Sequence, residues 1–252
     1  MVHLQNVVLK YGGKIILKGI NEQFNNNVFA CIIGKNGAGK STLLRALAGL
    51  MPYCGNITHN GVELQTMKKQ NRAQHISYIP QTRPIPASDV RTLISHGRFP
   101  HLGFSKTLST VDIEKIEAAA IIAGVEDLLH RDVLSLSGGE RQRVYIAMCI
   151  AQDAQLMIMD EPTVFLDIDY QLQIIELLKN LHKNKSIIIA IHDLQLAFTI
   201  AQQIILVSGQ SLVNLGAPES CCNNTLLQKT FGLALKGNSS SGSIYHYQLE
   251  RL

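Results

Sequence analysis

One glycine-rich run combines residue types that can together hold a chain of phosphates. Between residues 34 and 42 the sequence reads Gly-Lys-Asn-Gly-Ala-Gly-Lys-Ser-Thr. Glycine allows backbone conformations that bring N–H groups close to an anion. Lys40 would reach the β- and γ-phosphates, and the Ser41 hydroxyl would hold Mg²⁺. The run therefore predicts a nucleoside triphosphate site, made by Gly34, Asn36, Gly37, Ala38, Gly39, Lys40, Ser41 and Thr42.

Two adjacent carboxylates could act on the same nucleotide. Asp160 and Glu161 directly follow residues 156–159, an apolar run that is typical of a buried strand. An acidic residue at such a strand end helps to hold magnesium in enzymes with a phosphate-binding loop, and we assign this role to Asp160. Glu161 is placed to accept a proton from an attacking water as a general base. The alternative is that Glu161 only caps the turn before Pro162.

A histidine ends a third apolar run. His192 directly follows residues 186–191, which are rich in isoleucine. Ligands of open α/β sheets gather at the carboxyl ends of the strands. His192 could therefore donate a hydrogen bond to the γ-phosphate and orient the water. The alternative is a histidine that only completes the local structure.

Strands and helices must position these residues. Residues 28–33 predict a buried strand before the glycine run, and residues 41–48 predict a helix that ends at Gly49. A hairpin signal lies at residues 59–61, and residues 89–131 predict a helical portion with its strongest helix at 111–123. Strand and helix then alternate as far as Gly209. The pattern predicts an α/β protein.

Length, composition and net charge limit the kind of protein further. The chain has 252 residues, 46% of them hydrophobic, and a net charge of +4, which suits one large α/β domain with a helical insert. No apolar run reaches the roughly 20 residues that span a bilayer, and the first residues do not read as a signal peptide. We therefore expect a soluble protein. The charge forms no basic stripe, so we expect no nucleic-acid partner.

The cysteines and the C-terminal segment give few indications of function. Five cysteines without a CxxC pair argue against a disulfide framework or a zinc site, and Cys31 and Cys149 fall in predicted core segments. Nothing in the sequence assigns a role to Cys221-Cys222. Residues 237–243 predict a flexible linker, and residues 244–249 could add one strand.

With these motifs in order, the chain resembles the ATP-binding subunit of an ABC transporter between residues 11 and 216. The motifs are similar to the adenine-stacking aromatic, the Walker A loop, the Q-loop, the signature, Walker B with its catalytic glutamate, the D-loop and the switch histidine. In this sequence they are Tyr11, residues 34–42, Ile79-Pro80-Gln81, Leu136-Ser137-Gly138-Gly139-Glu140, residues 156–161, Leu166-Asp167 and His192. Each has a simpler alternative on its own: Tyr11 as an aromatic at a strand end, Gln81 as a turn residue, and the signature as a capped helix start.

The resemblance implies a fold and a site. The expected fold is a P-loop NTPase core sheet with an antiparallel β subdomain and a helical signature subdomain. The cassette would span residues 1–236, with the helical subdomain inserted at about 82–155, and residues 237–252 would form the linker and tail. Catalysis would rest on Glu161, His192 and Gln81. Tyr11, the loop and Ser137, Gly138 and Gly139 would bind ATP, and Ser41, Gln81 and Asp160 would hold Mg²⁺.

The resemblance also implies partners. Two copies would meet head to tail with two ATP molecules between them, so that the signature of one copy closes over the γ-phosphate held by the other. Permease subunits would bind the dimer at the cytoplasmic side of the inner or plasma membrane, and a substrate-binding protein would act indirectly. One departure concerns the D-loop, which reads Val164-Phe165-Leu166-Asp167 where the family usually has Ser-Ala-Leu-Asp. The aspartate is kept, but a serine hydroxyl that could reach across the dimer is lost, and Phe165 adds bulk where the family packs tightly.

A short string points to one group within the family. His96-Gly97-Arg98-Phe99-Pro100-His101 resembles the importer ATPases for iron–siderophore complexes, haem and cobalamin, and residues 192–197 fit that group. We expect this string to contact a transmembrane partner; its alternative is a surface turn set by Pro100. A soluble ABC ATPase of the DNA repair or translation type is the rival function, and a P-loop kinase is a third. The sequence does not identify the cargo.

Overall fold

A computed structural model describes residues 1–103, 107–221, 225–240 and 244–251 of the chain. The chain divides into two compact units, one of residues 1–66 with 186–252 and one of residues 67–185. The second unit contains the helical insert expected at about 82–155. It begins before that insert and ends after it, because two strands and two helices outside these bounds cluster with it.

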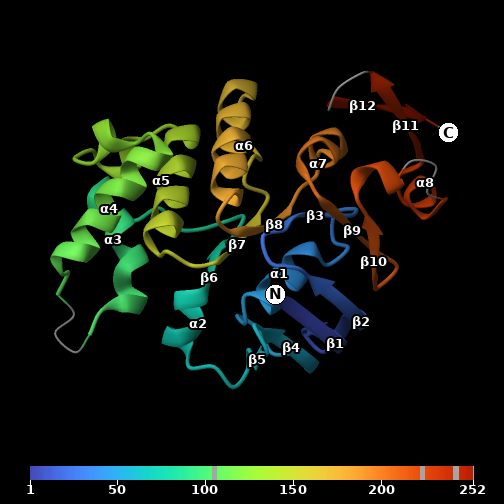
Figure 1. Cartoon of the computed structure of the whole chain (residues 1–252), viewed down its shortest axis with the longest axis horizontal. Coiled ribbons are helices and arrows are strands. Elements are labelled where there is room, and N and C mark those ends of the chain that lie inside the picture. Colours follow the sequence, from blue (N-terminus) through green and yellow to red (C-terminus); the bar gives the residue numbers. More distant parts are fainter. Residues whose placement is uncertain (104–106, 222–224, 241–243, 252) are drawn as a thin grey trace. The chain divides into compact units, whose positions relative to one another are not determined.

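The first unit contains an antiparallel sheet. Its strands are β1 (Val2–Tyr11), β2 (Lys14–Phe24), β4 (Cys54–His59) and β5 (Val62–Glu63), in the order β2-β1-β4-β5 (Figure 1). Asn60 and Gly61 join β4 to β5 with φ angles of 49° and 81°. Asparagine and glycine tolerate this left-handed conformation, which a tight hairpin requires. The predicted hairpin is confirmed.

The same unit holds the strand that precedes the glycine run. β3 (Phe29–Ile33) is buried throughout and pairs in parallel with β8 (Ser186–Ala190) and β9 (Gln203–Ser208). β10 (Ser211–Gly216) pairs antiparallel with β9. The helices of this unit are α1 (Lys40–Leu47), α7 (Leu194–Ile200), α8 (Thr225–Phe231) and a 3₁₀ helix at Pro218–Cys221.

The C-terminal segment differs from the expected linker. β11 (Leu233–Ser240) pairs antiparallel with β12 (Ile244–Arg251), in a register that sets Gly237 opposite Tyr247. Residues 237–240 therefore belong to a strand, because β12 supplies backbone hydrogen-bond partners that a linker would take from water. Residues 241–243 of the expected linker lie outside the described residues. The added strand at 244–249 is confirmed.

The second unit joins two parallel strands to a group of helices. β6 (Ile76–Ile79) pairs with β7 (Leu156–Asp160). The helices are α2 (Lys69–His75), α3 (Val90–Ser95), α4 (Thr110–Ala123), α5 (Gly138–Ala151) and α6 (Ile168–His182), with 3₁₀ helices at His96–His101, Glu126–Leu128 and Val133–Ser135. The strong helix predicted at 111–123 is confirmed as α4. It begins at a capping box of Ser109 and Asp112 and ends at Gly124 in the left-handed conformation. Within the described residues, no helix is long and apolar enough to cross a membrane.

The cysteines expected in the core are there. Cys31 in β3 and Cys149 in α5 are buried. Burial raises the pKa of both thiols, that of Cys149 to about 12. Both residues therefore pack as small hydrophobic side chains and not as reactive thiolates. Cys221 is also buried, and Cys222 lies outside the described residues.

Within the string expected to contact a transmembrane partner, Arg98 has a structural role. Its side chain is buried, pairs with Asp112 at 2.8 Å and donates to the carbonyl of Ala151 at 2.7 Å. His101 lies 2.9 Å from the carbonyl of Gln152 through Nε2. Arg98 therefore ties the 3₁₀ helix at 96–101 to α4 and to the end of α5, and it is not available to a partner. The exposed member of the string is Phe99.

Arg98→Met tests this structural role. Removing one partner of a buried ion pair leaves the other without compensation, so the free energy of unfolding should fall by about 3–5 kcal/mol. Urea denaturation measures the change. Phe99→Ala is the matched control, because its exposed side chain should change stability by about 0.5 kcal/mol or less. Equal effects of the two substitutions would place Arg98 at the surface.

Candidate functional site

The glycine run forms a tight loop between β3 and α1. Gly34 is packed so closely that a Cβ atom there would lie 2.6 Å from the carbonyl oxygen of Val207. Gly39 has a φ of 110°, and a Cβ atom on it would lie 2.7 Å from Ile16. Both positions exclude any larger residue. The loop conformation therefore depends on these glycines.

Lys40 folds back over the loop. Its side chain is buried, and its ammonium group donates to the carbonyl of Gly34 at 2.9 Å and more weakly to that of Lys35 at 3.4 Å. The cation is thus held beside the loop backbone at the start of α1. Ser41 and Thr42 are half-buried in the first turn, while Asn36 and Gly37 are exposed.

The amino end of α1 is built to receive an anion. Its N-cap is Gly39, and within the described residues no side chain caps this end and no acidic residue lies in its first turn. By contrast α3, α4, α5, α6 and α7 all have a side chain that accepts a hydrogen bond from the first turn, while in the described part of the chain the short α2 lacks one as α1 does. The first N–H groups of a helix need acceptors, and phosphate oxygens are suited to that place.

Strand register brings His192 to the same sheet edge as the loop. Ile32 of β3 is paired with Ala190 of β8. Gly34 and His192 each lie two residues further along, past the carboxyl ends of two neighbouring parallel strands. Tyr11, the expected adenine-stacking residue, ends β1 and is 67% exposed. Its ring is therefore accessible to a planar ligand.

In the second unit, register brings Gln81 to Glu161. Ile79 of β6 is paired with Met159 of β7. Gln81 lies two positions after Ile79, and Glu161 lies two positions after Met159. Gln81 Nε2 donates to Glu161 Oε2 at 2.5 Å, which leaves the amide oxygen of Gln81 directed elsewhere as an acceptor. Asp160 and Glu161 are both buried. The structure thus brings the predicted base and the predicted glutamine into direct contact.

The segment after Glu161 has an unusual backbone. Glu161 and Phe165 have φ angles of 53° and 63°, a region that side-chain-bearing residues rarely occupy. Asp167 then accepts a hydrogen bond from the N–H of Tyr170 at 3.0 Å and begins α6. Phe165, the departure seen in the D-loop, is 97% exposed. Its bulk therefore does not pack within the second unit.

The expected signature forms a capped helix start. Ser137 accepts from the N–H of Glu140 at 3.2 Å, and the Glu140 carboxylate accepts from the N–H of Ser137 at 2.8 Å. These bonds, the second above all, lower the pKa of Glu140. The N–H groups of Gly138 and Gly139 belong to the same first turn and take no part in this capping box. Gly139 is needed for packing, since a Cβ atom there would lie 2.4 Å from the ring of Tyr170.

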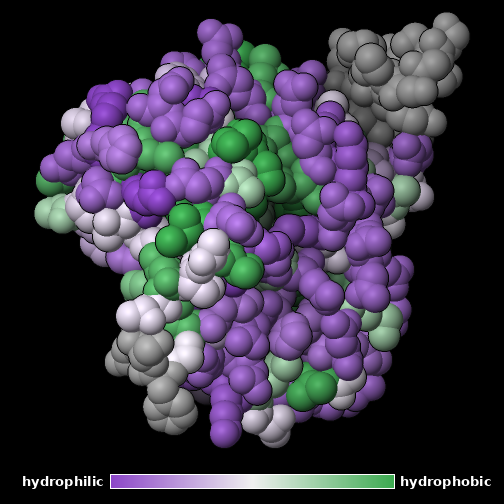
Figure 2. Space-filling view, turned by 60° about the vertical axis from the view of Figure 1, so that its left-hand side comes forward, coloured by the Kyte–Doolittle hydropathy of each residue, from purple (hydrophilic) through white to green (hydrophobic). Residues whose placement is uncertain are grey.

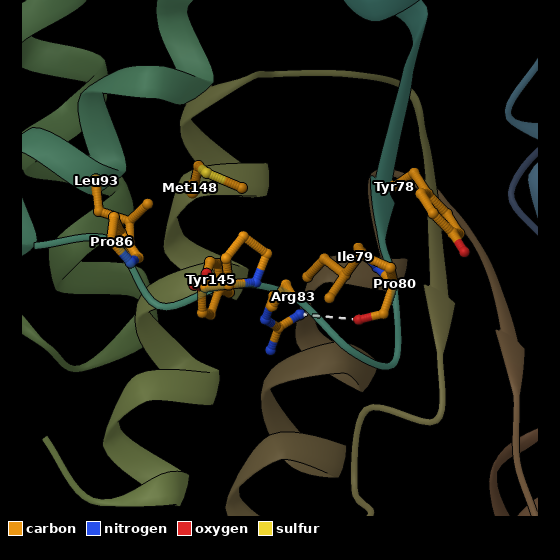
Figure 3. A pocket seen from close by; sticks show the side chains of 9 residues that line it. Tyr78, Ile79, Pro80, Arg83, Pro86, Leu93, Tyr145 and Met148 are labelled. Atoms are coloured by element: carbon orange, nitrogen blue, oxygen red, sulfur yellow. Dashed lines mark hydrogen bonds between the residues drawn. The ribbon is translucent and has the colours of Figure 1, made fainter. Parts of the chain in front are cut away.

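A pocket of about 280 Å³ lies beside the loop that follows Gln81 (Figure 3). Apolar side chains line most of it, and Arg83 lies in its wall against the ring of Tyr145. Sequence reasoning did not identify Arg83 or Tyr145, because no motif spacing connects residue 83 with a helix some sixty positions later. The residues that line the pocket are Tyr78, Ile79, Pro80, Arg83, Pro84, Pro86, Leu93, Tyr145 and Met148.

A buried parallel strand, a glycine loop with an inward lysine and a helix with an open amino end define a P-loop nucleoside triphosphatase. The family model described as "ABC transporter" matches residues 17–164. The chain belongs to the ABC transporter family, as an ATP-binding member that hydrolyses ATP.

Curated relatives cover most of the chain. The petrobactin import ATP-binding protein FpuD of Bacillus anthracis is 34% identical over 231 residues, which are 90% of this chain and 85% of that protein. The ferric enterobactin transport ATP-binding protein FepC of Escherichia coli (strain K12) is 34% identical over 233 residues, with 91% and 86% covered.

Solved structures confirm the predicted fold class. An inward-facing structure of a putative metal-chelate type ABC transporter has a TM-score of 0.84 at 24% identity and covers 99% of this chain and 97% of that one. The dimeric structure of MJ0796, a bacterial ABC transporter cassette, has a TM-score of 0.74 at 25% identity, with 84% and 96% covered.

The two signature glycines provide a matched test of the local packing. Gly139→Ala forces a methyl group against Tyr170, so the free energy of unfolding should fall by about 1–3 kcal/mol. Gly138→Ala meets only Leu166, at an ordinary 3.8 Å, and should leave stability unchanged or slightly raised. Urea denaturation of both variants makes the comparison. A larger loss for Gly138→Ala would contradict the packing described here.

Proposed function

We propose that this chain is the ATP-hydrolysing subunit that powers an importer for metal chelates of the iron–siderophore, haem or cobalamin type. The hydrogen bond between Gln81 and Glu161 carries the catalytic part of the proposal, because it fixes a carboxylate beside an amide at the end of a buried strand. The relatives named for petrobactin and ferric enterobactin import support the cargo class.

The proposed roles follow the chemistry of each group. The N–H groups of residues 34–42 and the ammonium of Lys40 bind the ATP phosphates, and Tyr11 stacks on adenine. Glu161 takes the proton of the attacking water, and Gln81 and His192 orient that water. That these residues serve the same reaction is part of the proposal and rests on the family to which the chain belongs.

Magnesium would be held by Ser41, Gln81 and Asp160. Their donor set is one hydroxyl, one amide oxygen and one carboxylate, and Mg²⁺ prefers oxygen ligands of this kind. The Gln81 hydrogen bond fits this role, since its nitrogen is turned to Glu161 and its oxygen is the remaining donor atom. The ion would neutralise charge on the β- and γ-phosphates during hydrolysis.

A second copy of the chain would complete the site. In the proposed head-to-tail dimer, Ser137 and the N–H groups of Gly138 and Gly139 meet the γ-phosphate bound by the partner. The dimeric form of the similar cassette MJ0796 supports this arrangement. In this dimer the partner copy would cover Phe165, whose side chain has almost no contact within its own unit.

Permease subunits would bind the second unit from the cytoplasmic side of the membrane, and a substrate-binding protein would act only through them. Hydrophobic side chains reach the surface in several groups among hydrophilic ones (Figure 2). Exposed apolar side chains that gather on a surface are typical of sites for protein partners. Those of the second unit include Phe99, Val111, Ile121, Ile122, Leu134, Phe165, Ile168 and Leu172.

Glu161→Gln tests the assignment of the base. The amide cannot take up a proton but can still accept the bond from Gln81, so ATP binding should persist while turnover falls about 10²–10⁴-fold. The variant should also accumulate as an ATP-bound dimer in size-exclusion chromatography. Lys40→Ala should instead lose ATP binding, and the exposed Glu176→Gln should change neither property. Turnover of Glu161→Gln within a few-fold of the parent would exclude Glu161 as the base.

Reconstitution tests the cargo class. The chain is assembled with its permease in proteoliposomes, and ATP turnover is measured with the substrate-binding protein loaded or unloaded. A ferric siderophore, haem or cobalamin should raise turnover, because loaded binding protein favours the closed dimer. If only a cargo without a metal chelate raises turnover, the cargo class is wrong.

A further inference from the structure

The loop that carries Gln81 has no regular structure of its own. It runs from Pro80 to Asp89, between β6 and α3, and contains three prolines. At its carboxyl end the loop is held by its backbone, since the N–H of Val133 donates to the carbonyl of Ser88 at 3.0 Å. Nearer to Gln81 the loop is held by side chains, and Arg83, two residues after Gln81, makes several of those contacts.

Arg83 attaches this loop to α5. One of its terminal nitrogens donates to the carbonyl of Pro80 at 3.3 Å, and the other donates to Oε1 of Gln142. The guanidinium plane lies over the ring of Tyr145, 3.8 Å from its centroid (Figure 3). Tyr145 in turn donates from its hydroxyl to the carbonyl of Pro84 at 3.0 Å.

The partners on α5 belong to one helical face. Gln142 and Tyr145 are three residues apart and lie in the first turns after the Ser137 cap. Arg83 and Pro84 are thus fixed to the helix whose amino end carries the signature glycines. A single short cluster joins the loop of Gln81 to the start of α5.

This geometry needs an arginine. Burial lowers the pKa of the Arg83 guanidinium, and in the part of the chain that the structure describes no carboxylate lies within ion-pair distance of it. Two amide-type acceptors and an aromatic face satisfy the cation instead. Only a planar group with several donors can stack and donate in two directions at once, and a lysine ammonium cannot.

We infer that Arg83 is a positioning residue for ATP hydrolysis, which holds Gln81 against Glu161 by clamping their loop to the signature helix. Two residues of chain span at most about 7 Å. A displacement of Arg83 would therefore also displace Gln81. The inference rests on the proposed roles of Gln81 and Glu161. It predicts an effect on the chemical step and none on ATP binding, because the proposed phosphate ligands are residues 34–42 and Arg83 is not one of them.

Arg83→Met is the direct test, in the full-length chain. It keeps much of the volume and removes every donor, so kcat should fall about 10–100-fold, the usual effect of a small misplacement of a catalytic group. The KM for ATP should stay within about two-fold on the same grounds. Arg83→Lys should recover only part of kcat. Arg91→Met, which removes a partly exposed arginine of α3 that pairs with Glu117, is the matched control and should leave both constants unchanged.

A second variant shows whether Arg83 acts through α5. Gln142→Leu should lower kcat in the same direction, and the double variant should be no slower than Arg83→Met alone, since both substitutions break one cluster. Multiplied losses in the double variant would overturn the inference. A rise in KM that matches the loss of kcat, or a fall in the folded fraction that accounts for it, would also overturn it, because Arg83 would then support the structure in general.

Comparison with Glu161→Gln separates this inference from the proposed function. If Glu161→Gln abolishes turnover and Arg83→Met leaves kcat unchanged, only the positioning role is wrong. If turnover survives in both variants, Glu161 is not the base, and the role of Arg83 is lost with it.

Discussion

Parallel pairing of buried strands is the constraint on which the candidate site depends. In the first unit the pairing of Ile32 with Ala190 fixes where the chain leaves β3 and β8. In the second unit the pairing of Ile79 with Met159 does the same for β6 and β7. In both units the candidate site residues come two positions after these pairs, Gly34 with His192 and Gln81 with Glu161. A slip of one residue in either register would turn the side chains to the opposite face.

Helix caps decide which backbone groups remain for a ligand. Asp89, Ser109, Ser137, Asp167 and Asp193 each use a side-chain oxygen on the first turn of the helix that follows. The helix after the glycine run begins at Gly39, which has no side chain to offer. Side-chain oxygens therefore satisfy five amino ends, whereas α1 and the shorter α2 have no side-chain cap among the residues that the structure describes. Of these two, α1 directly follows the glycine run, and its first N–H groups are the ones that could receive an anion.

The sequence was most informative where one local pattern settles the structure. The glycine run, the apolar runs before Asp160 and His192, and the α4 segment each predicted an element that the structure confirms. The assigned roles of Gln81, Glu161, His192 and the other site residues stay predictions. Contacts between distant segments were not predictable: Arg98 belongs to a string expected to contact a partner, yet its own side chain is buried against Asp112 and the Ala151 carbonyl. The pairing of residues 237–240 also depends on a later strand, and local composition carried no sign of it.

The pairing of Arg98 with Asp112 has a consequence for behaviour in acid. Asp112 accepts bonds from the hydroxyl and N–H of Ser109 as well as from Arg98, and these contacts lower its pKa to about 2. An aspartate in an unfolded chain has a pKa near ~3.9. Its contribution to stability is therefore complete above about pH 4 and is lost as the pH falls through about 2. Protonation of Asp112 weakens both the cap of α4 and the buried ion pair with Arg98. Strongly acidic solution therefore loosens the attachment of the 96–101 segment.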